Sequence, residues 1–577
     1  MSKFFITNNK SWYQQTKERI SESDYSLAFD YVNDGVCALS THKLKIKNNN
    51  AYEDANGDFV IATGTAIYKE SLDYTSVIFD FESIGIEGIR NNTIGQYAYA
   101  IKKGAEINVF GDAIGAYNIY YYCDHGNFYV SNFLYDMAMV LSQYLSLNEM
   151  NLLEQAVQCA ILNNETFFNE IKRLDGNESI SIENGDFQIV TFIPHLPIYE
   201  DSKLAANKLA GRLSYKASVI TKVLGDPSIC MTGGLDSRMS LAAYLSVGAK
   251  PTLSFALSNT RIASPEQMDI DIIHKFTNVF ELKENIHACD TRFPGGDWNY
   301  YLNKYGFSYT LWGGVKDVMH FFENMPGLLC TFGYGGELFR NVNLTESRTS
   351  DISIEELINE YFMRHGHAEL DKYDELRNHI KNKLIAVAHK YNIDINHLHP
   401  EDVSLFFIEY RKVADSTTMN YINFIEYSNM LLMESDVVAL CRIHTADMDK
   451  ARYMLDTLNN LYPPVLEIPV FSHHKLLRYD PKKMILYSGL EAKRPLLLIR
   501  LKEIYKRFSF ILKPARDLYK YFERNSSEST PKETIKKETP SFEHNYGSDN
   551  ISFDNMNLTL QYVMNLKAIT TILKMKN

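Results

Sequence analysis

The most constraining feature of the sequence is the stretch from Ser228 to Arg238, which reads SICMTGGLDSR. A short apolar run ending at Met231 predicts a buried strand, and two glycines then interrupt it. From Asp236 onward, apolar residues recur with the spacing of a helix that reaches Val247. The stretch therefore predicts a strand, a glycine turn and the start of a helix.

A strand, glycine turn and helix start favour the binding of anions. The glycines let the backbone approach an oxyanion closely, and the helix start supplies unpaired N–H groups and a positive dipole end. Two hydroxyls add donors, and a carboxylate beside a polyphosphate commonly holds Mg²⁺. The alternative is an ordinary turn with an Asp or Ser cap. The candidate phosphate-binding residues are Thr232, Gly233, Gly234, Leu235, Asp236 and Ser237.

Composition indicates a globular chain of two or three domains. The chain has 577 residues, of which 45% are hydrophobic and 13% aromatic, so core material is ample. The formal net charge is −12, which argues against broad electrostatic binding to nucleic acid. A small molecule or a peptide is the expected partner.

The cysteines and apolar runs indicate a cytoplasmic protein. Seven cysteines are scattered without a C-x-x-C pair, which predicts neither a disulfide framework nor a zinc ribbon. The first residues lack the apolar core of a signal peptide, and no run approaches the roughly 20 apolar residues of a transmembrane segment.

Two kinds of periodicity divide the chain. Residues 1 to about 190 predict mostly strands, such as 59–63 and 107–110, separated by Gly, Asn and Asp turns. From about 200 the pattern becomes α/β, with a helix over the apolar positions 204–219 and a second buried strand at 253–257. A further helix is expected to start at Ser264 and Pro265.

Several phrases resemble the asparagine synthetase and β-lactam synthetase superfamily. GTAIY at 64–68, GQYAYA at 95–100 and FFNEIKRL at 167–174 resemble its N-terminal domain, and TGGLDS resembles its pyrophosphate loop. The resemblance implies an α+β Ntn-hydrolase-like sandwich of the class II amidotransferase kind over residues 1–195. It also implies an α/β ATP-pyrophosphatase (adenine nucleotide α-hydrolase-like) synthetase domain with a helical C-terminal part over 196–500.

The expected N-terminal domain departs from the family at its nucleophile. Glutaminase members expose a cysteine as the N-terminal residue, whereas this chain has Ser2 there and its first cysteine is Cys37. A serine activated by its own α-amine is conceivable. The preferred interpretation is a degenerate domain kept as a scaffold.

A second glycine-rich phrase, TFGYGGELF at 331–339, allows two alignments with the family. One leaves no acid at the family's Mg²⁺-binding aspartate. The other aligns Glu337 with that aspartate and Tyr334 with the glutamate of the asparagine synthetase phrase. A tyrosine at this position resembles the β-lactam synthetases, in which it works with a downstream glutamate. The second alignment gives Mg²⁺ two carboxylates, Asp236 and Glu337, and makes Glu434 the candidate partner of Tyr334.

The resemblance also implies adenine-binding and phosphate-neutralising positions. Main-chain groups of Cys230, Leu257 and Gly333 match positions that contact adenine in the family. Lys475 is the candidate for the lysine that neutralises the leaving phosphate, with Arg478 as an alternative.

Together these features predict an ATP- and Mg²⁺-dependent ligase that adenylates a carboxylate and lets an amine attack it. The missing cysteine favours a natural-product or peptide cyclase, lasso-like in kind, acting on a precursor peptide with a companion biosynthetic protein. One alternative is an amidotransferase that uses ammonia on a small-molecule, sugar or cell-envelope acid. Another is a non-catalytic ATP-binding scaffold. Residues 501–577 predict a basic helix, a flexible linker and a final helix.

Overall fold

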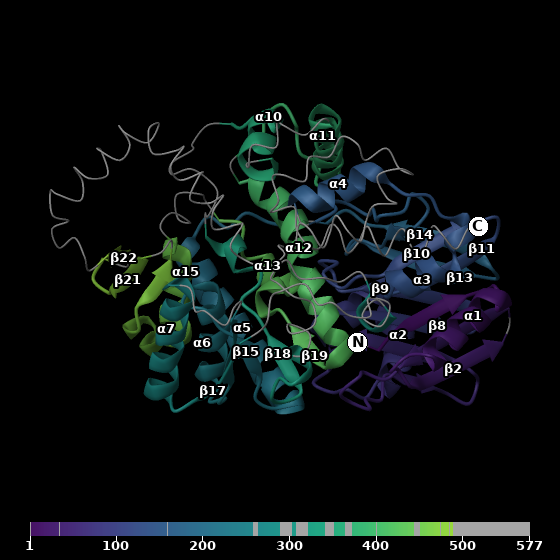
Figure 1. Ribbon diagram of the computed structural model, residues 1–577, viewed down its shortest axis with the longest axis horizontal. Coiled ribbons are helices and arrows are strands. Elements are labelled where there is room, and N and C mark those ends of the chain that lie inside the picture. The colour runs from purple at the N-terminus through teal and green to yellow at the C-terminus, as the bar shows by residue number, and fades with distance from the viewer. Residues whose placement is uncertain are drawn as a thin grey trace, which may run out of the picture.

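The computed structural model shows a mixed α/β protein built around two sandwiched antiparallel sheets and one parallel sheet (Figure 1). The sandwich lies at the right of Figure 1, the parallel sheet at the left, and α12 (Val403–Ile425) runs between them. The structure describes residues 2–33, 35–158, 160–194, 196–257, 264–288, 303–306, 321–340, 351–363, 372–399, 401–443, 451–472, 475–483 and 485–488. The expectations for residues 501–577 lie outside these ranges.

Each sheet of the sandwich has six strands, and every recorded pairing in it is antiparallel. The first sheet has the order β12 (Lys172–Arg173), β10 (Tyr120–Asp124), β11 (Asn127–Ser131), β1 (Phe4–Thr7), β3 (Val36–Thr41) and β2 (Leu27–Asn33). The second has the order β14 (Asp186–Thr191), β13 (Glu178–Glu183), β9 (Glu106–Gly111), β8 (Tyr97–Lys103), β5 (Phe59–Gly64) and β4 (Ala51–Glu53). A short pair, β6 (Ile67–Tyr68) and β7 (Thr93–Ile94), stands apart.

Strand β5 is buried on both of its faces, one against the other sheet and one against a helix. All of its residues are buried, and they alternate between two hydrophobic clusters. Phe59 and Ile61 pack between the two sheets, where the Phe59 ring lies 5.0 Å from that of Tyr31. Val60 and Ala62 face the cluster that includes α2 (Thr75–Asn91). An unbroken apolar run is expected for a strand covered on both faces.

The other helices of the first 195 residues flank the first sheet or follow it. Helix α1 (Lys10–Ser21) contacts β1, and α3 (Leu134–Val140) contacts both α1 and β11. The Asn9 side chain caps α1 by accepting from two backbone N–H groups. The 3₁₀ turn η1 (Ser142–Tyr144) and α4 (Glu149–Gln158) come next. The layers are therefore helix, sheet, sheet and helix.

The parallel sheet has the order β17 (Lys283–Ala288), β16 (Thr252–Leu257), β15 (Ser228–Cys230), β18 (Leu329–Thr331) and β19 (Tyr427–Asn429). All four pairings are parallel. The chain runs outward from β15 through β16 to β17 and then returns to the other side of β15. The direction of strand order therefore reverses between β15 and β18, which is where open parallel sheets bind ligands.

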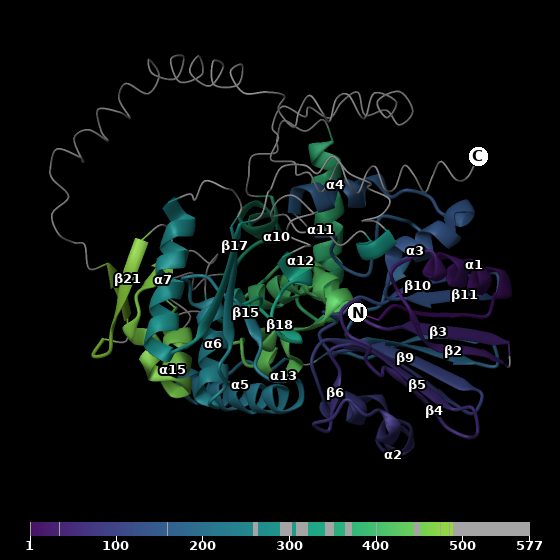
Figure 2. The ribbon, with the colours of Figure 1, turned by 60° about the horizontal axis from the view of Figure 1, so that its bottom comes forward.

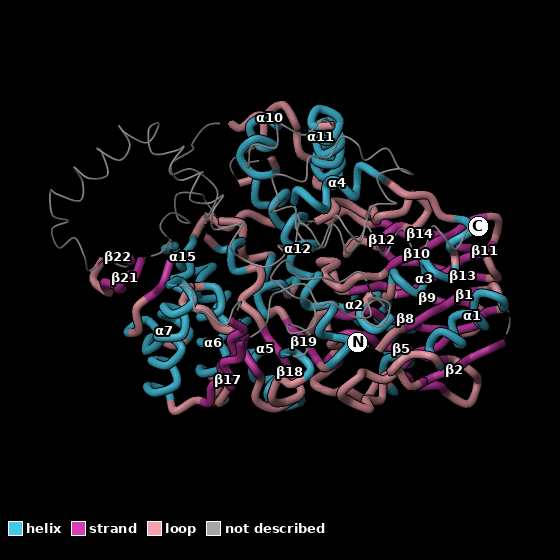
Figure 3. The backbone as a smooth tube through the Cα atoms, in the orientation of Figure 1, coloured by secondary structure: helices cyan, strands magenta, loops and turns pink. Residues whose placement is uncertain are grey.

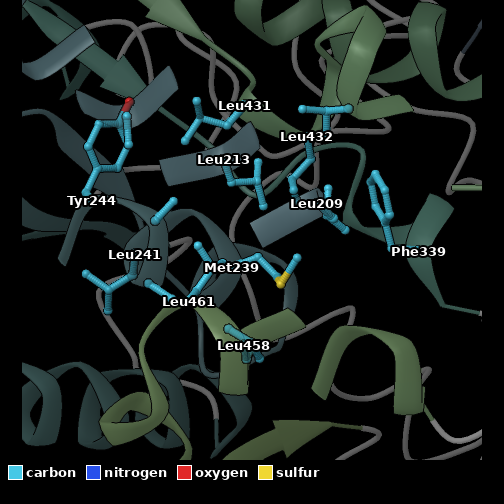
Figure 4. Packing of buried hydrophobic residues seen from close by; sticks show 14 of the residues in the cluster. Leu209, Leu213, Met239, Leu241, Tyr244, Phe339, Leu431, Leu432, Leu458 and Leu461 are labelled. Atoms are coloured by element: carbon cyan, nitrogen blue, oxygen red, sulfur yellow. The ribbon is translucent and has the colours of Figure 1, made fainter. Parts of the chain in front are cut away.

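Helices cover the parallel sheet and supply its core. They include α5 (Ser202–Leu224), α6 (Asp236–Ser246), α7 (Ser264–Phe280) and α15 (Arg452–Leu461). Figure 4 shows leucines of α5, α6 and α15 packed with Leu431 and Leu432 of the 3₁₀ turn η5 (Leu431–Met433). The observed α5, α6, β16 and α7 match the expectations for 204–219, 236–247, 253–257 and 264 onward within a few residues.

The remaining elements lie around this core. A helical layer contains α10 (Ile354–Leu357), the π-helical turn η3 (Ile358–Phe362) and α11 (Tyr373–Lys390), while α13 (Ser435–Val438) follows η5. Two further 3₁₀ turns are η2 (Gly336–Phe339) and η7 (Pro463–Glu467). Within the described residues, no helix combines the length and apolar character needed to cross a membrane.

The C-terminal part of 196–500, expected to be helical, contains the helices α12 and α15, but residues 470–488 form strands instead. The structure has a three-stranded antiparallel sheet there, formed by β20 (Val470–Ser472), β21 (Lys475–Asp480) and β22 (Ile485–Ser488). Figure 3 shows β21 and β22 as strands beyond α15. Branched and aromatic residues such as Val470, Tyr479 and Ile485 favour strands.

The sandwich and the parallel-sheet domain are joined by buried polar contacts. The Lys43 amine donates to the carbonyls of Gly64, Asn423 and Glu426. Lys43 is buried at the boundary where the two domains meet. Backbone N–H groups of residues 44 and 45 donate to the carbonyls of 424 and 425. Burial lowers the pKa of Lys43 to about 7. These bonds fix the two domains relative to one another.

A buried ion cluster also crosses this boundary. Asp175 of the sandwich domain lies 2.5 Å from the amine of Lys412 and 2.7 Å from that of Lys390. Burial alone would raise the pKa of Asp175, but the two ammonium groups outweigh it and hold the pKa well below the usual range.

We expect Asp175→Ala to lower the free energy of unfolding by about 3–5 kcal/mol, because it leaves two buried ammonium groups without this carboxylate. Urea unfolding followed by circular dichroism measures the loss. The control is Lys372→Ala, which breaks the exposed 3.0 Å pair with Glu149 and should cost about 1 kcal/mol or less. Because the Asp175 pKa is lowered, its contribution should be present above about pH 4 and disappear as pH falls further. Equal losses in the two variants would contradict the expectation.

Candidate phosphate-binding site at the ends of two parallel strands

The candidate site lies where the neighbouring strands β15 and β18 end (Figure 2). The glycine turn at 232–235 follows β15 and leads into α6, and the turn at 332–335 follows β18 and leads into η2. The two phrases that stand a hundred residues apart in the sequence are therefore adjacent in space. They flank the point at which the strand order reverses.

Gly333 of the second turn and Gly336 at the start of η2 pack directly on the start of α6. A Cβ added at Gly333 would lie 2.3 Å from the backbone nitrogen of Ser237, and one added at Gly336 would lie 2.5 Å from the Asp236 Cβ. The Ser240 hydroxyl donates to the Phe332 carbonyl at 2.9 Å, which ties α6 to the second turn. Only residues without a side chain allow this approach.

The first turn is held by its own hydroxyls and by one carboxylate from α7. The Thr232 N–H donates to the Ser237 hydroxyl at 3.1 Å, and the Gly233 N–H donates to Asp269 at 2.7 Å. Burial raises the pKa of Asp269, while the Gly233 N–H opposes this shift. The N–H groups of Gly234 and Leu235 have no acceptor among the described residues. These two N–H groups and the N-terminus of α6 are available for an anion.

Arg238 connects the first glycine turn to the segment between η7 and β20. Its guanidinium is fully buried and donates to the carbonyls of Val465, Ile468 and Pro469. The Gly233 carbonyl accepts from the N–H of Phe471 at 2.8 Å. Burial lowers the pKa of Arg238 to about 9. The chain from η7 to β20 is thus fastened to the glycine turn.

Two acid–arginine pairs lie beside the turns. The Asp236 carboxylate accepts from Arg340 through both oxygens, at 2.9 and 2.6 Å, and Glu337 lies 2.7 Å from Arg411. Arg411 also pairs with Asp415 at 2.7 Å. Burial opposes protonation of Arg340, but its pairing with Asp236 raises the pKa above the ordinary value. Burial raises the pKa of Asp415 to about 6, against the influence of Arg411.

The donor set is compatible with a magnesium ion that also binds phosphate. Among the described residues, no group of three or more His, Cys, Asp and Glu side chains could hold a metal ion by itself. Asp236 and Glu337 would supply carboxylate oxygens, and each oxygen retains lone pairs beside its arginine. Mg²⁺ commonly takes one or two carboxylates and completes its shell with substrate phosphates and water.

Tyr334 and Glu434 occupy different surroundings. The Tyr334 ring stacks on that of Phe332 at 4.8 Å and is half-buried. Glu434 follows η5 with 4% of its surface exposed, and it accepts from Asn429 at 2.9 Å and Lys216 at 3.3 Å. Within the described residues, no hydrogen bond joins Tyr334 to Glu434. Their pairing stays a prediction.

The sandwich also contributes to the surroundings of Glu434. The Gln96 side chain donates to Glu434 at 3.4 Å and to the Met430 carbonyl at 3.1 Å, and it accepts from the Met430 N–H. Gln96 comes from the loop before β8, so the N-terminal domain reaches the end of β19. It therefore helps to set the position of Glu434.

The remaining predicted residues lie at strand ends or strand starts. Cys230 ends β15, with its sulfur 3.7 Å from that of Cys330, and Leu257 ends β16. Their backbones therefore reach the same edge of the sheet as the glycine turns. Lys475 begins β21, and its side chain lies outside the described residues.

Ser2 is buried beneath the end of β11. Its side chain has no exposed surface, and its carbonyl accepts from the Asn132 side chain at 3.0 Å. The next residue, Lys3, places its amine 2.7 Å from Asp136 and 3.6 Å from the centre of the Phe133 ring. Burial lowers the pKa of Lys3 to about 8, against the influence of Asp136. A nucleophile must be reached by its substrate, and the Ser2 side chain is buried.

Sequence reasoning missed several residues that shape the site. Arg340 directly follows the predicted phrase, and a cation there could have been noted as a counter-charge for Glu337 or Asp236. Asp269, Arg411 and Lys216 carry no local signal, since each is an ordinary charged residue on a helix. Their roles depend on long-range contacts.

Comparisons with known proteins give little further definition. No family model matches the chain, and no curated protein matches its sequence. One similar solved structure is described as the allosteric regulatory enzyme of purine biosynthesis, with 8% identity and a TM-score of 0.25, over 50% of this chain and 80% of that one. Another is glutamine phosphoribosylpyrophosphate amidotransferase from B. subtilis complexed with ADP and GMP, with 11% identity and a TM-score of 0.22, over 44% and 65%. TM-scores this low support no conclusion about chemistry.

We expect Gly333→Ala to separate the two turns, because the new methyl group would meet backbone atoms of Asp236 and Ser237. Overpacking of this kind costs about 1–3 kcal/mol, which thermal unfolding would reveal. Gly211→Ala is the matched control, since nothing lies within 4 Å of its Cβ position in α5. It should leave the protein as stable or slightly more stable. An unchanged melting temperature for Gly333→Ala would show that the turns do not pack as closely as described.

Proposed function

We propose that the chain is an ATP-dependent, AMP-forming amide ligase that adenylates a carboxylate and passes the acyl group to an amine. The observation that carries the proposal is the contact between the two glycine turns at the reversal of strand order. It brings N–H donors, the Thr232 and Ser237 hydroxyls and two carboxylates to one edge of a parallel sheet.

In the proposed reaction, a substrate carboxylate attacks the α-phosphate of ATP, and pyrophosphate leaves. The N–H groups of Gly234 and Leu235, with the N-terminus of α6, would hold the β- and γ-phosphates. Asp236 and Glu337 would hold Mg²⁺, which neutralises phosphate charge when it is bound. Main-chain groups at Cys230, Leu257 and Gly333 are the proposed contacts to adenine.

An amine then attacks the acyl-adenylate, and AMP leaves. The phenol of Tyr334, which lies in the second turn, is the proposed group that takes the amine proton. Glu434 would support it at a distance, through the Asn429, Lys216 and Gln96 contacts that fix the end of β19. Lys475 is the proposed cation that stabilises the transition state.

The burial of Ser2 supports an amine that does not come from glutamine hydrolysis in the sandwich. We therefore favour a natural-product or peptide cyclase, with an amine on the substrate itself or on a second substrate. An amidotransferase supplied with free ammonia remains the second candidate, because it would also work without a nucleophile at Ser2. A non-catalytic ATP-binding scaffold is the third.

We expect exchange of labelled pyrophosphate into ATP when the full chain is given Mg²⁺ and its carboxylate substrate. Asp236→Asn should lower the exchange rate by about 10²-fold or more, because it removes a charge at the leaving phosphates. Asp186→Asn on the exposed strand β14 should have no effect.

Exchange at the wild-type rate in Asp236→Asn would refute the proposed site. A folded, ATP-binding protein without exchange on any carboxylate would favour the scaffold. AMP release driven by ammonium would favour the amidotransferase.

We expect Tyr334→Phe to abolish amide formation while leaving pyrophosphate exchange within about threefold of wild type. The substitution keeps the ring that stacks on Phe332 and removes only the hydroxyl. Product formation and exchange measured on the same preparation separate the two steps. Normal product formation by this variant would exclude the hydroxyl as the proton acceptor.

A further inference from the structure

A cavity lies between the sandwich and α12, apart from the strand ends that carry the candidate phosphate site. Its volume is about 80 Å³, and its walls come from β10, the 155–173 segment, residues 305–306 and α12. A buried water needs about 10–15 Å³ by the same measure, so the cavity has room for about six waters or one small organic molecule.

Arg173 lines this cavity as a buried cation, and no carboxylate of the described residues pairs with it. Only 4% of its surface is exposed, and its one side-chain hydrogen bond to a described residue runs from Nη2 to the Asn163 carbonyl at 2.7 Å. Its Nε has no acceptor among the described residues. Glu165, which lines the same cavity, is paired with Lys383 at 3.1 Å instead. A buried guanidinium without a counter-charge is costly, and this cost would be relieved by an anion.

Two amides on the cavity wall also have unused hydrogen-bonding capacity. The Asn118 Oδ1 is buried and has no partner among the described residues. The half-buried Gln155 side chain makes no hydrogen bond with any described residue. By contrast, the neighbouring Asn420 amide is satisfied by the Ala116 and Ser416 carbonyls. The cavity therefore offers a cation together with polar groups that could recognise a second feature of a ligand.

The rest of the wall is aromatic. Tyr120 lies opposite Arg173 in the pairing of β10 with β12, and Phe167 also lines the space. Phe133 and Phe424 meet edge to face with ring centres 4.9 Å apart, one from the sandwich and one from α12. These rings would contact the apolar part of a ligand.

We propose that this cavity binds a small organic carboxylate of about amino-acid size. The carboxylate pairs with the Arg173 guanidinium, whose planar donors match its geometry. The amides of Asn118 and Gln155 contact any further polar group, and the aromatic rings surround the apolar part. Because both domains form the wall, the bound ligand touches the sandwich and α12 together.

The test measures the melting temperature of the full chain with isobutyrate or benzoate, at constant ionic strength, against the neutral isobutyramide and benzamide. At least one acid should raise the melting temperature with saturation, and the amides should not. Arg173→Gln should weaken the apparent affinity at least tenfold. The control is Lys172→Gln on the same strand, which should respond as wild type does because residue 172 does not line the cavity.

A wild-type protein that responds to neither acid overturns the proposal, as does an Arg173→Gln variant that responds normally. If Arg173→Gln does not fold, Leu134→Phe provides the second test, since Leu134 lines the cavity and a larger ring would occupy it. Loss of the acid-dependent shift in folded Leu134→Phe supports the cavity as the site. A retained shift places the acid elsewhere and overturns the proposal.

Discussion

The candidate site depends on the close packing of one glycine turn against the start of a helix. Gly333 and Gly336 lie so near Asp236 and Ser237 that a side chain at either glycine would displace them. This contact places Asp236 and Glu337 at one sheet edge, and it leaves each carboxylate within reach of an arginine. The parallel pairing of β15 with β18 makes the contact unavoidable, because both turns begin where these strands end.

Local pattern predicted the elements that carry this contact, and it failed where distant residues decide the outcome. Strand β15 and helix α6 follow from an apolar run, two glycines and helical spacing. The Asp236–Arg340 and Glu337–Arg411 pairs could not be predicted, because nothing in a local pattern says which cation faces which acid. The strands after Val470 were missed for a related reason: short apolar segments near a helical region fit either structure until their partners are known.

The N-terminal sandwich holds Ser2 buried and makes polar contacts with the rest of the chain. Gln96 contacts Glu434 and Met430, and Asp175 pairs with Lys390 of α11 and Lys412 of α12. The sandwich therefore contacts both the end of β19 and the helices α11 and α12. A cavity with an uncompensated Arg173 lies along the same boundary, so this boundary combines fixed contacts with space for a ligand.

The Lys43 amine is bound by one carbonyl from the sandwich and two from the other domain. This shared contact constrains how the gene can evolve. A gene cut between the two domains would yield one product with a buried lysine lacking acceptors and another with carbonyls lacking a donor. Recombination that exchanged either domain alone would meet the same penalty. The two domains are therefore expected to be inherited together.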